Sequence, residues 1–109
     1  MAVLFLARAA RLLSDRLMAE EAMRQTLLHL QALQDEDTGL LFHGWNCEAG
    51  DWMSAARWNR ANAWNLCAVP MIREELAHID ADVDRLGEIG RRYGRLAEAV
   101  AARQNATGL

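Results

Sequence analysis

The sequence predicts an all-α protein made of two helix pairs that would stack in a ring or array. Apolar residues recur every three or four positions over long stretches, which is typical of helices. In each half of the chain a uniformly apolar helix precedes a more amphipathic one, so each pair is expected to have an inner and an outer member. A turn motif also recurs after each outer helix, at residues 32–40 and 101–109. Repeated helix pairs that cannot bury their faces alone normally pack against neighbouring pairs.

The composition is that of a folded chain. Of the 109 residues, 52% are hydrophobic and 25% are charged, which argues against disorder. We expect residues 1–109 to form part of a single domain. The formal net charge of -3 gives no reason to expect nucleic acid or a membrane surface as partner. Cys47 and Cys67 are too few for a disulfide framework or a zinc site, and together with the lack of a long apolar run they favour a cytoplasmic location.

The first helix pair is expected at residues 1–13 and 17–34. Residues 1–13 carry apolar side chains on nearly every side, so this inner helix should be buried on both sides within something larger. Ser14 and Asp15 mark a short break between the two helices. Residues 17–34 combine an apolar stripe with a charged and polar side, so this helix should face outward.

A turn and then mostly irregular chain are expected after the first pair. Asp35 to Gly39 should end the outer helix, because Gly39 suits a turn with positive φ. Leu40 to His43 are expected to be extended, and a loop should follow as far as about Arg57.

The second inner helix is expected to begin at Trp58 or Asn59 and to be interrupted at Pro70. Proline has no backbone N–H, and its ring clashes with the preceding turn, so the helix should kink or end there. Residues 70–76 are then expected to continue as a new helical segment with Pro70 in its first position.

The second outer helix is the clearest amphipathic helix in the chain. The acidic residues of 80–84 favour a helix start, and apolar residues continue at helical spacing as far as Val100. Gly87, Gly90 and Gly94 share this helix, although glycine costs about 1 kcal/mol relative to alanine in a helix interior. We expect them to allow close approach of another helix.

The candidate site lies between Thr38 and Trp64, a stretch that holds all four tryptophans. An arginine on an inner helix needs an anionic partner, and the guanidinium of Arg60 would suit a carboxylate. Trp58 and Trp64 would add flat aromatic faces, and His43 would add a polar ring. From the residues alone the alternative stays open that the tryptophans form a hydrophobic core. The sequence shows no metal-ligand spacing, phosphate loop or nucleophile motif.

Two motifs in this stretch carry a resemblance to a known family. They are Asp35-x-x-Thr38-Gly39-Leu40-x-x-His43-Gly44-Trp45 and Trp58-x-Arg60-x-Asn62-x-Trp64. Upstream, Phe5-Leu6-Ala7 and Glu21-Ala22-x-x-Gln25 fall on the expected inner and outer helices. In this order and spacing the chain resembles the unsaturated uronyl hydrolases of glycoside hydrolase family 105 and the related family 88. These enzymes act on unsaturated rhamnogalacturonyl and glucuronyl saccharides left by polysaccharide lyases.

The resemblance implies an (α/α)6 barrel of inner and outer helices, to which this chain would supply about four helices. It also implies an unusual glycosidase reaction that needs no metal or organic cofactor. An aspartic acid protonates the vinyl ether of the unsaturated uronate, water adds to the cation, and the hemiketal collapses to release the aglycone. The implied partner is therefore an unsaturated uronate-bearing oligosaccharide.

The resemblance also implies roles for individual residues. Arg60 matches the arginine at the uronate carboxylate, Trp58 and Trp64 match the aromatic walls of the pocket, and His43 matches a histidine that contacts the sugar. Trp45 is expected to support the turn.

The chain departs from the family at the catalytic acid. The family's aspartate would fall just upstream of Met1, so no residue of this chain is expected to be catalytic, and Asn46 stands where an acid is often found. We therefore expect a glycoside hydrolase-like fragment that binds substrate and is inactive alone. The alternative is a catalytically dead helical module for carbohydrate binding or interaction. Half a ring should also expose apolar faces, through which the chain would self-associate.

Overall fold

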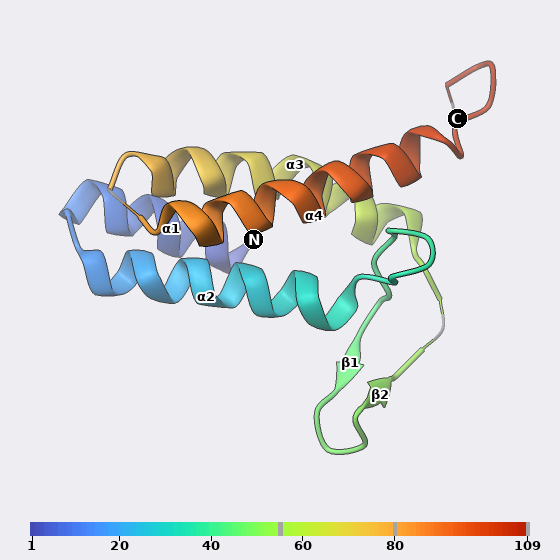
Figure 1. Ribbon diagram of the computed structural model, residues 1–109, viewed down its shortest axis with the longest axis horizontal. Helices are drawn as coiled ribbons and strands as arrows, with labels where there is room; N and C mark the ends of the chain where they lie inside the picture. The colour runs from blue at the N-terminus through green and yellow to red at the C-terminus, as the bar shows by residue number, and fades with distance from the viewer. Residues whose placement is uncertain (55, 80, 109) are drawn as a thin grey trace.

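Among the residues that the structure describes, four helices and one small hairpin make up the fold. The computed structural model describes residues 1–54, 56–79 and 81–108. Its elements, in chain order, are α1 (Ala2–Leu13), α2 (Arg16–Leu33), β1 (Trp45–Asn46), β2 (Asp51–Trp52), α3 (Asn59–Ala77) and α4 (Val83–Ala101) (Figure 1). The expected all-α class is confirmed. No helix in these residues is long and apolar enough to cross a membrane.

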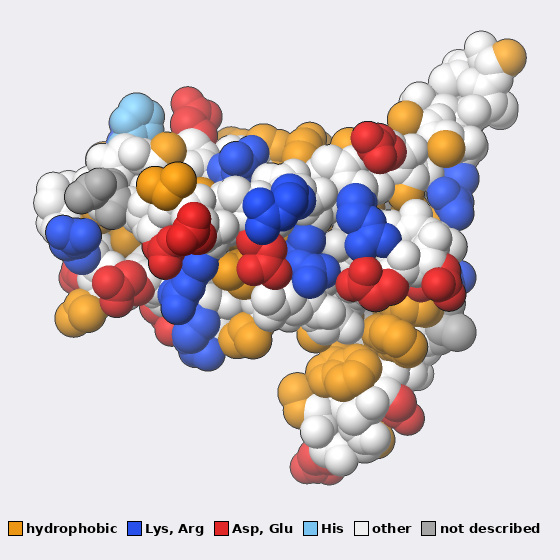
Figure 2. Space-filling view, in the orientation of Figure 1, with side chains coloured by type: hydrophobic (Ala, Val, Ile, Leu, Met, Phe, Trp, Pro, Cys, Tyr) orange, Lys and Arg blue, Asp and Glu red, His pale blue; other side chains and the backbone are white. Residues whose placement is uncertain are grey.

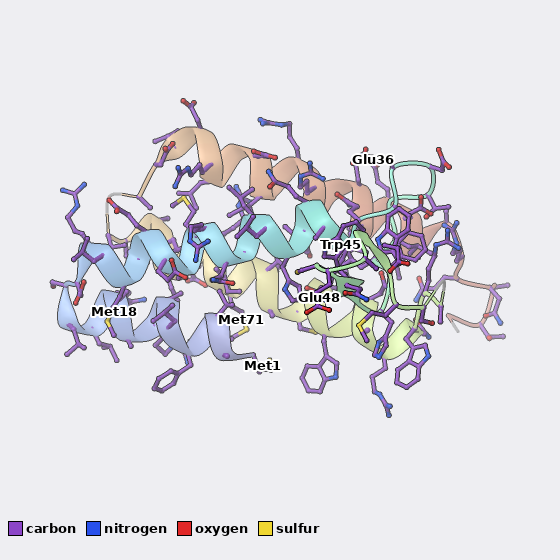
Figure 3. The ribbon with its side chains drawn as sticks, turned by 90° about the horizontal axis from the view of Figure 1, so that it is seen from below. Met1, Met18, Glu36, Trp45, Glu48 and Met71 are labelled. Carbon is purple, nitrogen blue, oxygen red and sulfur yellow. The ribbon has the colours of Figure 1, made fainter. Side chains whose placement is uncertain are left out.

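The helices form two layers. α1 packs against α2 and α3, and α4 packs against α3 and α2. Seen from below, α2 and α4 lie on one side and α1 and α3 on the other, with Met1 and Met71 on the α1–α3 side (Figure 3). Their shared core contains Ala7 and Ala10 of α1, Met23 and Leu30 of α2, Leu76 of α3, and Ile89 and Leu96 of α4. The predicted pairs of inner helices (α1, α3) and outer helices (α2, α4) are therefore present.

The break between α1 and α2 lies where the sequence predicts it. Ser14 ends α1 with φ 53°, in the left-handed region. Asp15 then caps α2, because its Oδ1 accepts a hydrogen bond from the Met18 N–H at 3.0 Å.

α1 exposes apolar side chains in this chain, in line with the expectation that it would be buried on both sides only within something larger. The helix is covered by α2 and α3 but is not buried on both sides, because Phe5 is 77% exposed and Leu12 is 75% exposed. The chain therefore presents an apolar surface on its inner layer.

Pro70 does not end α3. The helix runs without a break from Asn59 to Ala77. Pro70 leaves the Leu66 carbonyl without its normal helical donor. The hydroxyl of Tyr93 on α4 donates to that carbonyl at 3.4 Å, so the neighbouring helix supplies a replacement. This contact could not be predicted from the sequence, because Tyr93 and Leu66 lie on different helices.

α4 begins as predicted, and among the glycines Gly90 and Gly94 have different surroundings. Asp82 caps the helix by accepting from the N–H groups of Asp84 and Arg85, while Asp80 lies outside the described residues. A Cβ at Gly90 would lie 2.9 Å from Cζ of Arg73, so a side chain of α3 occupies that space. A Cβ at Gly94 would meet nothing within 4 Å. Gly90 therefore allows the expected close approach of a neighbouring helix through Arg73, whereas nothing among the described residues comes as close to Gly94.

The two copies of the turn motif share an internal hydrogen bond from a glutamine side chain to a glycine carbonyl, which supports the repeat. The Gln34 side-chain amide donates to the Gly39 carbonyl at 3.0 Å, and the Gln104 amide donates to the Gly108 carbonyl at 3.0 Å. Gly39 has φ 80° and Gly108 has φ 85°. The last residue of the second copy, Leu109, is not among the described residues.

The outer layer presents charges to the solvent. Basic and acidic side chains alternate across α2 and α4 in Figure 2. Part of this pattern is a network in which Glu36 pairs with Arg95 at 2.8 Å and with Arg92 at 3.6 Å, while Arg92 also pairs with Glu88 at 3.2 Å. This charged surface agrees with the prediction that α2 and α4 face outward.

Candidate functional site

The start of α3 presents an aromatic ring and a cation together. Trp58 precedes the helix in extended conformation and provides no side-chain cap. The guanidinium carbon of Arg60 lies 5.5 Å from the centroid of the Trp58 ring, within the range of a cation–π contact. Among the described residues no acidic side chain pairs with Arg60. A carboxylate from a ligand would therefore meet an uncompensated guanidinium.

His43 completes the group that the sequence predicted. Its ring lies 4.6 Å from the Trp58 ring, centroid to centroid, with the two planes tilted by 31°. Its backbone N–H donates to the Ala56 carbonyl at 3.1 Å, which holds the two segments side by side. His43, Trp58 and Arg60 thus form one exposed cluster, called here the ring–cation cluster.

Trp64 lies apart from this cluster. It is four residues after Arg60 on α3 and lines a separate cavity of about 240 Å³ with Met1, Thr26 and His29. No ring contact joins Trp64 to Trp58 in the described residues. The structure therefore assembles three of the four predicted site residues and places the fourth one turn further along the same helix.

The other two tryptophans support the loop. β1 and β2 pair antiparallel, with Trp45 opposite Trp52, in a segment for which the sequence predicted only a loop. Their rings meet edge to face at 5.7 Å, and Trp52 also stacks on Phe42 at 4.2 Å. The indole N–H of Trp52 donates to the Ala32 carbonyl of α2 at 3.1 Å. The hairpin is thereby fixed to the end of α2 (Figure 1), and the predicted supporting position of Trp45 agrees with these contacts.

The tryptophans do not form a common core. Trp58 is 49% exposed and Trp64 is 54% exposed, whereas Trp45 is partly buried against the core. The alternative in which all of them are core residues is therefore wrong for Trp58 and Trp64.

Asn62 joins the extended segment to α3. It is 2% exposed, and its side chain both accepts from the Leu41 N–H at 2.8 Å and donates to the Leu41 carbonyl at 3.0 Å. It also donates to the Trp58 carbonyl at 2.9 Å. Leu41 was expected to be extended, and it forms a bridge with Gln34. The sequence motif contains Asn62, but nothing in the sequence showed that its amide would bind this backbone.

Asp35 anchors the turn beside the cluster. The carboxylate accepts from the Thr38 hydroxyl at 2.6 Å, from the Asp37 N–H at 3.1 Å and from Arg57 at 2.7 Å. The Thr38 hydrogen bond, with help from the Asp37 N–H and the Arg57 guanidinium, lowers the pKa of Asp35. Asp35 is therefore a charged structural residue at neutral pH.

Paired inner and outer helices are the architecture of helical-barrel proteins, and the ring–cation cluster lies where an inner helix begins. The chain belongs to Glycosyl Hydrolase Family 88, whose family model matches residues 1–109.

Two similar proteins agree with this assignment. The chain is 38% identical over 64 residues to the unsaturated rhamnogalacturonyl hydrolase YesR of Bacillus subtilis. A solved structure from Salmonella enterica, described as a possible member of glycoside hydrolase family 105, superposes with a TM-score of 0.89 at 35% identity over 100% of this chain. This likeness confirms the expected fold class, four helices of an (α/α)6 barrel in inner and outer pairs.

The chain spans only part of the length of these proteins. The match covers 59% of this chain but 19% of the Bacillus protein, and the superposition covers 29% of the Salmonella chain.

Proposed function

We propose that the chain binds the unsaturated uronate end of an oligosaccharide through His43, Trp58, Arg60 and Trp64. The observation that carries this proposal is the pairing of the Arg60 guanidinium with the Trp58 ring at 5.5 Å, with no acidic partner among the described residues. The family assignment supports a carbohydrate as the ligand. A uronate carries both a carboxylate and a flat, apolar ring face.

Each residue of the ring–cation cluster suits one part of such a ligand. Arg60 would bind the carboxylate through two parallel hydrogen bonds. Trp58 would contact the sugar ring, and His43, whose ring lies against that of Trp58, would bond a hydroxyl group. α3 starts without a side-chain cap, and the positive end of its dipole favours a negative charge close by. Trp64 would extend the aromatic wall toward the start of α1.

The reaction proposed for the whole enzyme is hydration of the double bond of the unsaturated uronate, followed by release of the aglycone. The resemblance places the aspartic acid that gives the proton upstream of Met1. The 109-residue chain should therefore show no more than trace activity. The ultraviolet absorbance of the double bond provides the assay, and robust loss of absorbance would contradict this expectation.

Calorimetric titration with an unsaturated rhamnogalacturonyl disaccharide tests the binding site. Arg60→Gln should weaken binding about tenfold or more, because it removes a charged pair with the carboxylate. Arg91→Gln is the matched control, since it removes an exposed arginine from α4, outside the cluster. Equal affinities of the two variants, or no binding by the unaltered chain, would reject the proposal.

A second candidate function is a helical interaction module that has lost catalysis. The exposed Phe5 and Leu12 on α1 favour it, because they offer an apolar surface to a partner. In this alternative the partner is a second copy of the chain.

For both candidates we propose a cytoplasmic location, in keeping with the free, exposed thiols of Cys47 and Cys67.

A further inference from the structure

Three consecutive residues each contact a different residue at the start of α3. The backbone of Leu41 bonds the Asn62 side chain. The Phe42 ring lies under the Arg57 guanidinium at 4.5 Å, and the His43 ring lies against the Trp58 ring at 4.6 Å. Residue 42 thus faces residue 57, and residue 43 faces residue 58. The His43–Trp58 pair sits directly beside the Phe42–Arg57 pair.

Arg57 is held from two sides. Its Nη2 donates to Oδ2 of Asp35 at 2.7 Å, while its guanidinium covers the Phe42 ring. Asp35 is itself immobilised by Thr38 and Asp37, and only 7% of it is exposed. A charged hydrogen bond to a fixed carboxylate, combined with a cation–π contact on Phe42, leaves Arg57 little freedom. The residue that follows it, Trp58, is restrained with it.

We propose that Arg57 is a positioning residue, which clamps the chain before Trp58 onto Phe42 and Asp35 and thereby sets how the His43 and Trp58 rings face each other. Part of the inference rests on the proposed function, because a sugar would bind across these rings and their spacing would then control affinity. Arg57 acts through Trp58 and does not itself contact the ligand.

Arg57 can be replaced without opening the core. Its side chain is 37% exposed, whereas Asn62 is buried and holds the fold together at the same place. Arg57→Gln removes the ion pair with Asp35 and the cation over Phe42. Arg95→Gln is a matched control, because Arg95 pairs with Glu36, the neighbour of Asp35, and its side chain is 42% exposed. Arg95 lies on α4 and has no ring contact in the described part of the chain.

The first measurement is the proton chemical shift of the His43 ring in NMR spectra, which the ring current of Trp58 displaces. Arg57→Gln should move this shift toward that of a free histidine, and Arg95→Gln should leave it unchanged. Circular dichroism should show the same helix content in both variants. An unchanged His43 shift in Arg57→Gln would overturn the inference, whatever the ligand does.

The second measurement is the affinity for the unsaturated rhamnogalacturonyl disaccharide. Arg57→Gln should weaken binding about tenfold, since small misplacements of a binding group have large effects. Arg95→Gln should bind like the unaltered chain. A moved His43 shift with unaltered affinity would overturn the claim that ring spacing controls binding. Weaker binding without a moved shift would instead make Arg57 a direct ligand contact and reject the positioning role. If the unaltered chain binds no disaccharide, the proposed function fails, while the His43 shift still decides whether Arg57 positions the rings.

Discussion

The Tyr93 hydroxyl donates to the Leu66 carbonyl at 3.4 Å, at the point where Pro70 removes the normal donor from α3. We predict that Tyr93→Phe lowers the free energy of unfolding by about 0.5–1 kcal/mol, the usual net value of one such hydrogen bond. Urea denaturation of the two proteins would measure the difference.

The proline provides the control for this prediction. In Pro70→Ala the new backbone N–H can donate to the Leu66 carbonyl and make the Tyr93 hydroxyl dispensable. A double-mutant cycle should therefore show that Tyr93→Phe costs less in the Pro70→Ala background. Equal costs in both backgrounds would mean that the hydroxyl does not compensate for the proline.

Replacing Gly39 and Gly50 by alanine distinguishes backbone strain at positive φ from steric overlap of the new Cβ. Both have positive φ, 80° and 66°. A Cβ at Gly50 would meet nothing within 4 Å, whereas a Cβ at Gly39 would lie 2.9 Å from the Arg95 carbonyl oxygen. Gly50→Ala should cost about 1–2 kcal/mol of stability from backbone strain alone. Gly39→Ala should cost clearly more, because α4 must also shift. Thermal melts of both variants test this, and equal losses would show that the turn and α4 do not pack tightly.

The sequence predicted the helices well because their signals are local. Periodic apolar residues, the break at Ser14 and the acidic start of α4 act within a few positions, and each was found. The sequence does not show that α3 continues unbroken through Pro70, because the compensating hydroxyl comes from another helix. The β1–β2 hairpin was missed because it has only two residues in each strand and is held by the contact from Trp52 to Ala32.

The candidate site was predictable as a set of residue types but not as a geometry. The cluster of His43, Trp58 and Arg60 was expected, and the structure brings these residues together. Trp64 was expected beside them; its position four residues after Arg60 keeps it on the same side of α3, but it lines a separate cavity near the start of α1. Arg57 was not singled out, since only the fold reveals that it meets both Asp35 and Phe42.

Glu75 should make stability depend on pH. This glutamate of α3 is 6% exposed and pairs with Arg8 at 2.9 Å and Arg11 at 3.1 Å on α1. The hydrogen bond from Arg8, with the charges of both arginines, lowers the pKa of Glu75. The ionised Glu75 therefore contributes fully to the free energy of unfolding above its unfolded pKa of about 4.5. This contribution is lost as the pH falls through the lower pKa of the folded state.

Replacing the Glu75 carboxylate should reveal its pH-dependent contribution to stability. Glu75→Gln should lower the melting temperature by several degrees at pH 7, and the difference from the unaltered chain should narrow toward pH 2. Glu74→Gln, one position earlier on α3 and exposed, should have little effect at either pH. A difference that stays constant with pH would mean that shape rather than charge makes Glu75 important.

The exposed apolar residues of α1 should make the isolated chain self-associate. Phe5 and Leu12 lie on a helix whose other sides are covered by α2 and α3, and large exposed apolar patches normally mark surfaces of association. Sedimentation velocity should therefore show species larger than a monomer, and Phe5→Ser combined with Leu12→Ser should shift the population toward monomer. Val83→Ser is the control, because Val83 is 80% exposed but begins α4 in the outer layer. A clean monomer for the unaltered chain would contradict the prediction. Monomer formation in the Val83 variant as well would show that exposed apolar area in general, and not the surface of α1, drives the association.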